Sequence, residues 1–181
     1  MAPAARVRSF RAVIAADARI LILGSMPGVA SLQAQQYYAH PRNQFWSIMS
    51  RLCGAGVELS YLHRLQALQR GGVALWDVLH SCVRAGSLDA AIEHRSALPN
   101  DLPRLLRHHR DIVRLCCNGA TAHTALRRHF GGLLAEEFPH LDILLLPSTS
   151  PANASWSYAR KLDAWAAALS PARTARSISC A

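Results

Sequence analysis

The chain has 181 residues, of which 51% are hydrophobic and 17% charged, a balance that excludes a disordered protein and fits one globular domain. No apolar run approaches the ~20 residues that span a bilayer, and residues 1–10 lead into no secretory signal, so we expect no membrane association and a cytoplasmic protein. Twenty basic residues against 11 acidic ones give a net charge of +9, which favours a polyanionic partner, nucleic acid above all.

Apolar runs and helical patterns alternate along the chain and predict an α/β protein. In chain order we expect a strand at 19–24, helices at 43–52 and 61–68, a strand at 72–77, a helix at 102–106, a strand at 111–117, a helix at 121–130, a strand at 141–146 and a helix at 158–169. This order indicates a single-domain, three-layer fold with a central four-stranded parallel sheet flanked by helices. Around a domain at 19–169 we place an N-terminal lead-in at 1–18 and a frayed tail at 170–181.

The first predicted strand runs directly into the turn Gly24-Ser25-Met26-Pro27-Gly28. In open parallel sheets the ligand crevice lies beyond the carboxyl ends of the strands, so this turn is a candidate site. Its backbone N–H groups could converge on an anion or a carbonyl oxygen, although a plain structural turn is about equally plausible. The turn lacks the spacing of a dinucleotide site, the lysine of a P-loop and the nucleophile elbow of an α/β-hydrolase.

The next loop interleaves aromatic and polar side chains in the run Gln35-Gln-Tyr-Tyr-Ala-His-Pro-Arg-Asn-Gln-Phe-Trp46. Such side chains suit stacking on a base and hydrogen bonding to its edge. We expect Phe45 and Trp46 in the core. Tyr38 and Asn43 flank a turn stiffened by proline and are the stronger candidates. For His40 and Arg42, capping or bracing the following helix is an equally plausible role.

The fourth predicted strand leads into a stiff polar loop, Leu146-Pro-Ser-Thr-Ser-Pro-Ala-Asn153. Its hydroxyls and backbone amides are available to phosphate oxygens, whereas an ordinary connecting loop would rarely carry so much rigid polar chemistry.

The five cysteines form no Cys-x-x-Cys pair and are odd in number, and Cys116 and Cys117 are adjacent in an apolar run. Buried free thiols are the usual finding in such a run. We therefore expect reduced thiols, no disulfide, no zinc or iron–sulfur site and no cofactor.

Together these segments resemble the uracil-DNA glycosylase superfamily, and most closely its hypoxanthine-DNA glycosylase branch. The resemblance runs from Arg19 to about Trp165. It is carried by Leu23-Gly-Ser-Met-Pro-Gly28, Tyr37-Tyr-Ala-His-Pro-Arg-Asn-Gln-Phe-Trp46, Ala74-Leu-Trp-Asp-Val78, Arg84-Ala-Gly-Ser-Leu-Asp89 and Leu146-Pro-Ser-Thr-Ser-Pro-Ala-Asn153. The Ala-His-Pro-x-Asn-x-Phe-Trp element also looks like that of mismatch-specific uracil glycosylases, so it indicates the superfamily better than the substrate.

Two positions depart from the superfamily pattern. Most members position the attacking water with an Asp or Asn where this chain has Met26, and many carry a histidine where it has Leu146. The hypoxanthine branch is similar in this respect, and in it the asparagine that matches Asn43 is tied to activity. The resemblance therefore implies that Asn43 is the catalytic residue.

The implied activity is that of a monofunctional glycosylase of base excision repair, which rotates deoxyinosine out of the DNA and releases hypoxanthine. Tyr38 would stack on the base, and Ser25, Met26 and Gly28 would face it. Contacts to DNA are expected at His40, Arg42, Ser148, Thr149, Ser150, Pro151 and Asn153. The partner would be single- or double-stranded DNA that contains deoxyinosine, and the protein is expected to be a monomer.

Asp77 follows the second predicted strand and is therefore expected at the mouth of the crevice. In pyrimidine-cleaving relatives the similar position holds an asparagine that reads the base edge. An ionised Asp77 could accept from N1–H of hypoxanthine and would repel the bare N1 of adenine. The alternative is that Asp77 caps the following turn, a common role of aspartate.

Other functions stay open from the sequence. The same chemistry could act on uracil or a mismatched thymine. The fold could also be a DNA-binding module whose site decayed with Met26 and Leu146. A small nucleotide- or phosphoester-processing enzyme is a third possibility, although its expected lysine and metal-binding carboxylates are absent. A basic bias of the proteome would also explain the positive charge, since Lys161 is the only lysine.

Overall fold

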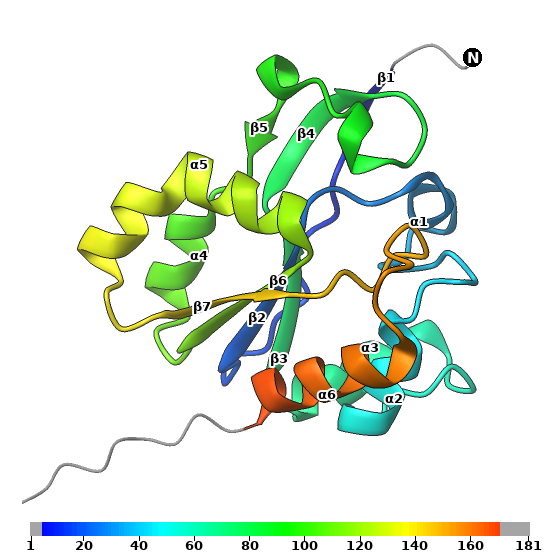
Figure 1. Ribbon diagram of the computed structural model, residues 1–181. Helices are drawn as coiled ribbons and strands as arrows, with labels where there is room; N and C mark the ends of the chain where they lie inside the picture. Colours follow the sequence, from blue (N-terminus) through cyan, green and yellow to red (C-terminus); the bar gives the residue numbers. More distant parts are fainter. Residues whose placement is uncertain (1–4, 171–181) are drawn as a thin grey trace, which may run out of the picture.

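The centre of the fold is a parallel sheet of four strands (Figure 1). The structure is a computed structural model and describes residues 5–170 of the chain. The strands are β2 (Ile20–Gly24), β3 (Val73–Asp77), β6 (Arg114–Asn118) and β7 (Asp142–Leu146), in the spatial order β3-β2-β6-β7. All four predicted strands are confirmed, and the third begins at Arg114 rather than at 111.

Six α-helices accompany the sheet within residues 5–170. They are α1 (Val29–Ala34), α2 (Phe45–Cys53), α3 (Tyr61–Arg70), α4 (Leu102–His108), α5 (Ala120–Glu137) and α6 (Tyr158–Leu169). Side chains of β2 alternate between the two faces of the sheet. Leu21 and Leu23 pack with residues of α4 and α5, whereas Ile22 packs with residues of α2, α3 and α6. Helices thus cover both faces, which confirms the predicted three layers (Figure 1).

The helices differ from the prediction in two places. The helix expected at 121–130 continues through Gly131 and Gly132 to Glu137, because Leu134 on the next turn is buried against the core. The sequence did not predict α1, which is six residues long and buries only Ser31. A helix this short carries little hydrophobic periodicity.

A second, antiparallel sheet was not predicted. Its strands are β1 (Ala5–Arg8), β4 (Leu79–Arg84) and β5 (Leu98–Pro99), in the order β1-β4-β5. Only Val78 separates β4 from β3, so the two strands read in sequence as one run followed by polar residues. β1 lies within the segment that we interpreted as a lead-in, and it pairs with β4 from Ala5 to Arg8.

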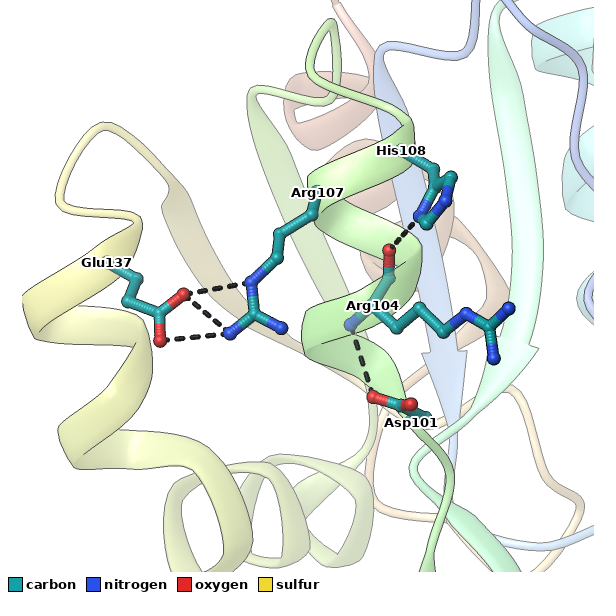
Figure 2. Close-up of polar contacts among 5 residues, drawn as sticks. All are labelled: Asp101, Arg104, Arg107, His108 and Glu137. Atoms are coloured by element: carbon teal, nitrogen blue, oxygen red, sulfur yellow. Dashed lines mark hydrogen bonds and ion pairs between the residues drawn. The ribbon is translucent and has the colours of Figure 1, made fainter.

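Two short 3₁₀ turns, η1 (Asp89–Ala91) and η2 (His94–Ser96), connect β4 to β5. Beyond β5, the side chain of Asp101 caps α4 by accepting from the N–H of Arg104 at 3.2 Å (Figure 2). Arg107 on α4 forms a bidentate ion pair with Glu137 at the end of α5, with Nη2 2.7 Å from Oε2 (Figure 2). Both side chains are exposed, so the pair contributes little to stability.

Within residues 5–170, no helix has both the length and the apolar character needed to cross a bilayer. Cys53, Cys82, Cys116 and Cys117 are free thiols. Cys180 and residues 171–181 of the predicted tail lie outside the described residues.

Gly119, between β6 and α5, allows the segments that follow β6 and β7 to approach closely. Its φ is +98°, and a Cβ added to it would lie 2.9 Å from Cβ of Ser148. Both the backbone conformation and the space therefore favour glycine.

We expect Gly119→Ala to lower the free energy of unfolding by about 1–3 kcal/mol, because the methyl group must strain the backbone and displace Ser148. Gly132→Ala is the matched control, since Gly132 lies on α5 with no atom within 4 Å of an added Cβ. That substitution should stabilise the helix by up to about 1 kcal/mol. Urea-induced unfolding measures both effects, and equal stabilities of the two variants would contradict the expectation.

Candidate functional site

A cavity of about 1120 Å³ opens at the carboxyl ends of the four parallel strands. It is lined by the turn after β2, the loop before α2, the segment before η1, the start of α5 and the loop after β7. All the site residues that the sequence predicted line this cavity: Ser25, Met26, Gly28, Tyr38, His40, Arg42, Asn43, Asp77, Ser148, Thr149, Ser150, Pro151 and Asn153. The structure therefore brings these segments together, as expected for loops at one edge of a parallel sheet.

The turn after β2 presents backbone N–H groups to the cavity because its carbonyl groups are bound from behind. The carbonyls of Gly24 and Ser25 accept from the N–H groups of Val78 and Leu79 at 2.8 and 3.2 Å. Within residues 5–170, the N–H groups of Ser25, Met26 and Gly28 take part in no hydrogen bond. They are therefore available to an oxygen atom in the cavity.

The buried guanidinium of Arg84 holds the second half of this turn. It donates to the carbonyls of Pro27 and Met26, the latter at 3.4 Å, and to the carbonyl of Gly86 at 3.0 Å. Arg84 is 2% exposed and forms no ion pair among the described residues. The carbonyl oxygens therefore supply the hydrogen bonds that offset the cost of burying this charged group.

Asp77 places a carboxyl group at the inner wall of the cavity. Its Oδ2 accepts from the hydroxyl of Ser9 at 3.0 Å. Burial, assisted by the charge of Asp89, raises the pKa of Asp77 to about 7, while the hydrogen bond from Ser9 opposes the shift. The N–H groups of Val78 and Leu79 donate to the turn after β2 instead of to this carboxyl, so Asp77 does not cap the turn that follows it.

Tyr38 adopts a left-handed backbone conformation, with φ of +56°. Its ring stacks on that of Phe45, with centroids 3.9 Å apart and planes at 23°. Phe45 and Trp46 are 0% and 3% exposed, which confirms that they belong to the core. A non-glycine residue in this conformation is uncommon and indicates that its surroundings hold the ring in place.

Asn43 lies in the same loop, and its Oδ1 accepts from the N–H of Phe45 at 3.0 Å. Within residues 5–170, its Nδ2 takes part in no hydrogen bond, so the amide offers N–H donors rather than an acceptor. His40 accepts from the N–H of Arg42 through Nδ1 at 3.1 Å, which is the bracing role that the sequence left open. The side chain of Arg42 is exposed at the rim.

The loop after β7 is fixed from within, and Thr149 is its anchor. The N–H of Thr149 donates to Oδ1 of Asn118 at 2.9 Å, and its hydroxyl accepts from Nδ2 of Asn118 at 3.0 Å. Thr149 is 0% exposed, so its burial does not support the expectation that it contacts phosphate. Its hydroxyl is instead used to tie the loop to β6.

Ser148 and Ser150 remain suited to anions. Each hydroxyl oxygen accepts from a backbone N–H two residues further on, at 3.2 Å in both cases, which leaves the hydroxyl proton free to donate. Asn153 has a bracing role, because its Nδ2 donates to the carbonyl of Ser148 at 3.1 Å. Lys161 supports the loop from α6, since Nζ donates to the carbonyl of Asn153 at 2.9 Å. Burial lowers the pKa of Lys161.

Sequence reasoning missed several residues of the cavity wall, among them Asp89, Asn118 and Trp156. Asp89 accepts from the hydroxyl of Ser25 through Oδ1 at 2.8 Å, and burial raises its pKa while that hydrogen bond and Arg84 oppose the shift. Asn118 is the last residue of β6, where the carboxyl-end rule could have found it. Trp156 is 36% exposed, and the guanidinium of Arg160 lies 4.4 Å above its ring. No group of three or more His, Cys, Asp or Glu side chains within residues 5–170 could hold a metal ion.

Comparison with known proteins agrees with this architecture. The model of the "Uracil DNA glycosylase superfamily" matches residues 12–169. The chain belongs to this superfamily. It is 32% identical to a protein of Methanosarcina acetivorans named hypoxanthine DNA glycosylase, over 86% of this chain and 94% of that protein.

Two further likenesses agree with this assignment. A Methanosarcina barkeri protein, also named hypoxanthine DNA glycosylase, is 40% identical over 87 residues, which are 48% of this chain and about half, 55%, of that protein. A solution NMR structure of a candidate uracil DNA glycosylase from M. acetivorans superimposes with a TM-score of 0.75 at 31% identity. It covers 91% of this chain and 97% of that one, so the predicted fold is confirmed.

The structure also places the two residues that depart from the superfamily pattern. Met26 and Leu146 line the cavity but are each only 6% exposed, and they pack into the hydrophobic clusters on the two sides of the sheet. Neither side chain can donate or accept a proton. Acid–base chemistry in this cavity therefore falls to other residues.

Asp77→Asn should become more stable relative to the unmodified protein as the pH rises. Because the pKa of Asp77 is raised in the folded state, its contribution to stability is present below pH 4 and is lost as the pH rises toward 7. A rise of one pKa unit on folding corresponds to about 1.4 kcal/mol of stability. Because an asparagine cannot ionise, Asp77→Asn does not lose this contribution as the pH rises. Thermal unfolding of both proteins from pH 4 to 8 measures the difference, and a constant difference would show that Asp77 ionises normally.

Proposed function

We propose that this protein hydrolyses the N-glycosidic bond of deoxyinosine in DNA and releases hypoxanthine. The observation that carries the proposal is the cavity itself, in which unpaired backbone N–H groups, an aromatic ring and the amide of Asn43 meet. The names of the two relatives support this choice of base. The bond between N9 of the base and C1′ of the sugar breaks, water supplies the hydroxyl group at C1′, and the base leaves with a proton.

A base inside a duplex cannot reach the cavity, so the nucleotide must rotate out of the stack at a cost of a few kcal/mol. Stacking on Tyr38, worth about 1–3 kcal/mol, offsets part of this cost. The net charge of +9 attracts the DNA, and the free hydroxyl protons of Ser148 and Ser150 suit phosphate oxygens at the rim.

In the reaction, negative charge develops on the departing base. The N–H groups of Ser25, Met26 and Gly28 are fixed donors at the cavity wall and would stabilise this charge. Nδ2 of Asn43 would donate to the base or to the attacking water. An amide is neither an acid nor a base near neutral pH, so the protein would stabilise an oxocarbenium-like state and react slowly.

The decisive measurement is the release of free base from duplexes that contain hypoxanthine, uracil or xanthine, compared side by side. Faster release of hypoxanthine supports the proposal. Preferred release of uracil would make the protein a uracil glycosylase of the same superfamily. Binding without release of any base would leave only a DNA-binding module.

Size-exclusion chromatography with and without DNA tests the accompanying proposal that the protein acts as a monomer.

Asn43→Asp separates catalysis from helix capping. The carboxylate can still accept from the N–H of Phe45, so the start of α2 is kept, but the N–H donors of the amide are lost. We expect excision to fall by at least a hundredfold with little change in melting temperature or DNA affinity. Ser47→Ala, an exposed change on α2 outside the cavity, is the control. Excision at the parent rate in Asn43→Asp would make Asn43 a purely structural residue.

The proposed enzyme should release the base without cutting the strand. Strand cleavage by a glycosylase usually needs an amine that forms a Schiff base with the sugar. Lys161 is the only lysine, it is 2% exposed, and its Nζ donates to the carbonyl of Asn153 instead of lining the cavity. Borohydride added during turnover should therefore trap no protein–DNA adduct, and the strand should break only after alkali. A trapped adduct would contradict this expectation.

A further inference from the structure

We propose that Asp89 holds the hydroxyl of Ser25 as a hydrogen-bond acceptor toward the cavity, and that this acceptor, beside the N–H donors of the same turn, reads the lactam edge of deaminated bases. The inference rests on the proposed function and assigns a substrate class to the same site. Asp89 would be a positioning residue, since it acts through Ser25.

The polarity of the Ser25 hydroxyl follows from its contact with Asp89. A hydroxyl has one proton and two lone pairs, and an ionised carboxylate can only accept. Oγ of Ser25 lies 2.8 Å from Oδ1 of Asp89, so its proton is committed to that bond. What Ser25 can still offer to the cavity that it lines is an acceptor.

The surroundings of Asp89 favour this arrangement. Burial raises the pKa of Asp89, whereas the hydrogen bond from Ser25, the positive charge of Arg84 and the side chain of Thr121, at the start of α5, oppose this shift and favour the ionised carboxylate. Asp89 opens η1, and its carbonyl accepts from the N–H of Ile92 at 3.0 Å, which fixes the backbone. The hydrogen bond from Ser25 and the fixed backbone of η1 thus keep the carboxylate facing the turn after β2.

The turn therefore carries an acceptor and donors next to each other. Backbone N–H groups of Ser25 and Met26 would meet a ring carbonyl, and Oγ of Ser25 would meet the ring N–H beside it. Hypoxanthine, xanthine and uracil all present this carbonyl and N–H as neighbours. Adenine and cytosine present an amino group beside a bare ring nitrogen, which would leave both partners on the turn unpaired.

Substrate selection would then follow deamination itself. Loss of the amino group from adenine or cytosine converts an edge that the turn rejects into an edge that it accepts. Guanine also carries the lactam edge. The acceptor and the donors of the turn therefore distinguish deaminated bases from adenine and cytosine but not from guanine. The size of the ring system does not enter this recognition, which allows one turn to accept both purines and pyrimidines.

The test is a double-mutant cycle on Ser25 and Asp89, with single-turnover release of hypoxanthine as the readout. Ser25→Ala and Asp89→Asn should each slow release by at least tenfold, and the double variant should be no slower than the slower single variant. Asp101→Asn is the control, because it removes the same charge from an exposed position outside the cavity and keeps a capping oxygen on α4. It should release hypoxanthine at the parent rate.

The second readout is the ratio of hypoxanthine release to adenine release. Asp89→Asn frees the hydroxyl of Ser25 to donate to a bare ring nitrogen, so the ratio should fall by at least tenfold, whereas mere damage to the fold would lower both rates together. If the effects of Ser25→Ala and Asp89→Asn add independently while the unmodified protein still releases hypoxanthine, this inference is overturned and the proposed function is not. If the unmodified protein releases no lactam base, the proposed function and the inference fail together. Should Asp89→Asn unfold, Ser25→Ala alone must still lower the ratio.

Discussion

The burial of Arg84 is the constraint on which the rest of the site depends. A guanidinium that is 2% exposed must be surrounded by acceptors, and here it donates to the carbonyls of Met26 and Pro27 in the turn after β2 and to that of Gly86, which follows β4. Those carbonyls are thereby turned away from the cavity. Because a peptide plane that points its oxygen backward points its N–H forward, the contact with Pro27 directs the N–H of Gly28 toward the cavity. The bonds from Val78 and Leu79 do the same for the N–H groups of Ser25 and Met26.

The charges of the molecule are separated in a way that suits its proposed ligand. The whole chain carries a net charge of +9, whereas the inner wall of the cavity carries the carboxyl groups of Asp77 and Asp89. A nucleotide has the opposite order, with negative phosphates outside and a neutral base at the end of its sugar. Long-range attraction would thus bring the DNA to the rim, while the two carboxyl groups disfavour the entry of phosphate itself.

The sequence predicted the elements whose signal is local. The four parallel strands are apolar runs because both their faces are covered, and five helices show apolar periodicity. The antiparallel sheet escaped prediction because β4 directly follows β3 and β5 has two residues. The roles of side chains could not be predicted where the hydrogen-bond partner is distant in the sequence. Thr149 resembled an ordinary loop hydroxyl, but its partner Asn118 lies 31 positions away. Asp89 and Ser25 are 64 positions apart, and no local pattern connects them.

The contact between Ser9 and Asp77 changes how the chain can be divided. Ser9 reaches the cavity wall from a segment that also pairs with β3 through Val13 and Leu75, and the carbonyl of Phe10 accepts from the indole of Trp76 at 3.2 Å. The segment from Ala5 to Val13 therefore takes part in both sheets and supports a residue of the cavity wall. A shortened protein that began at residue 19 would keep all the superfamily motifs, yet the buried carboxyl group of Asp77 would lose the hydroxyl of Ser9. It would also lose β1, so that the edge of the antiparallel sheet at β4 would be exposed to other chains.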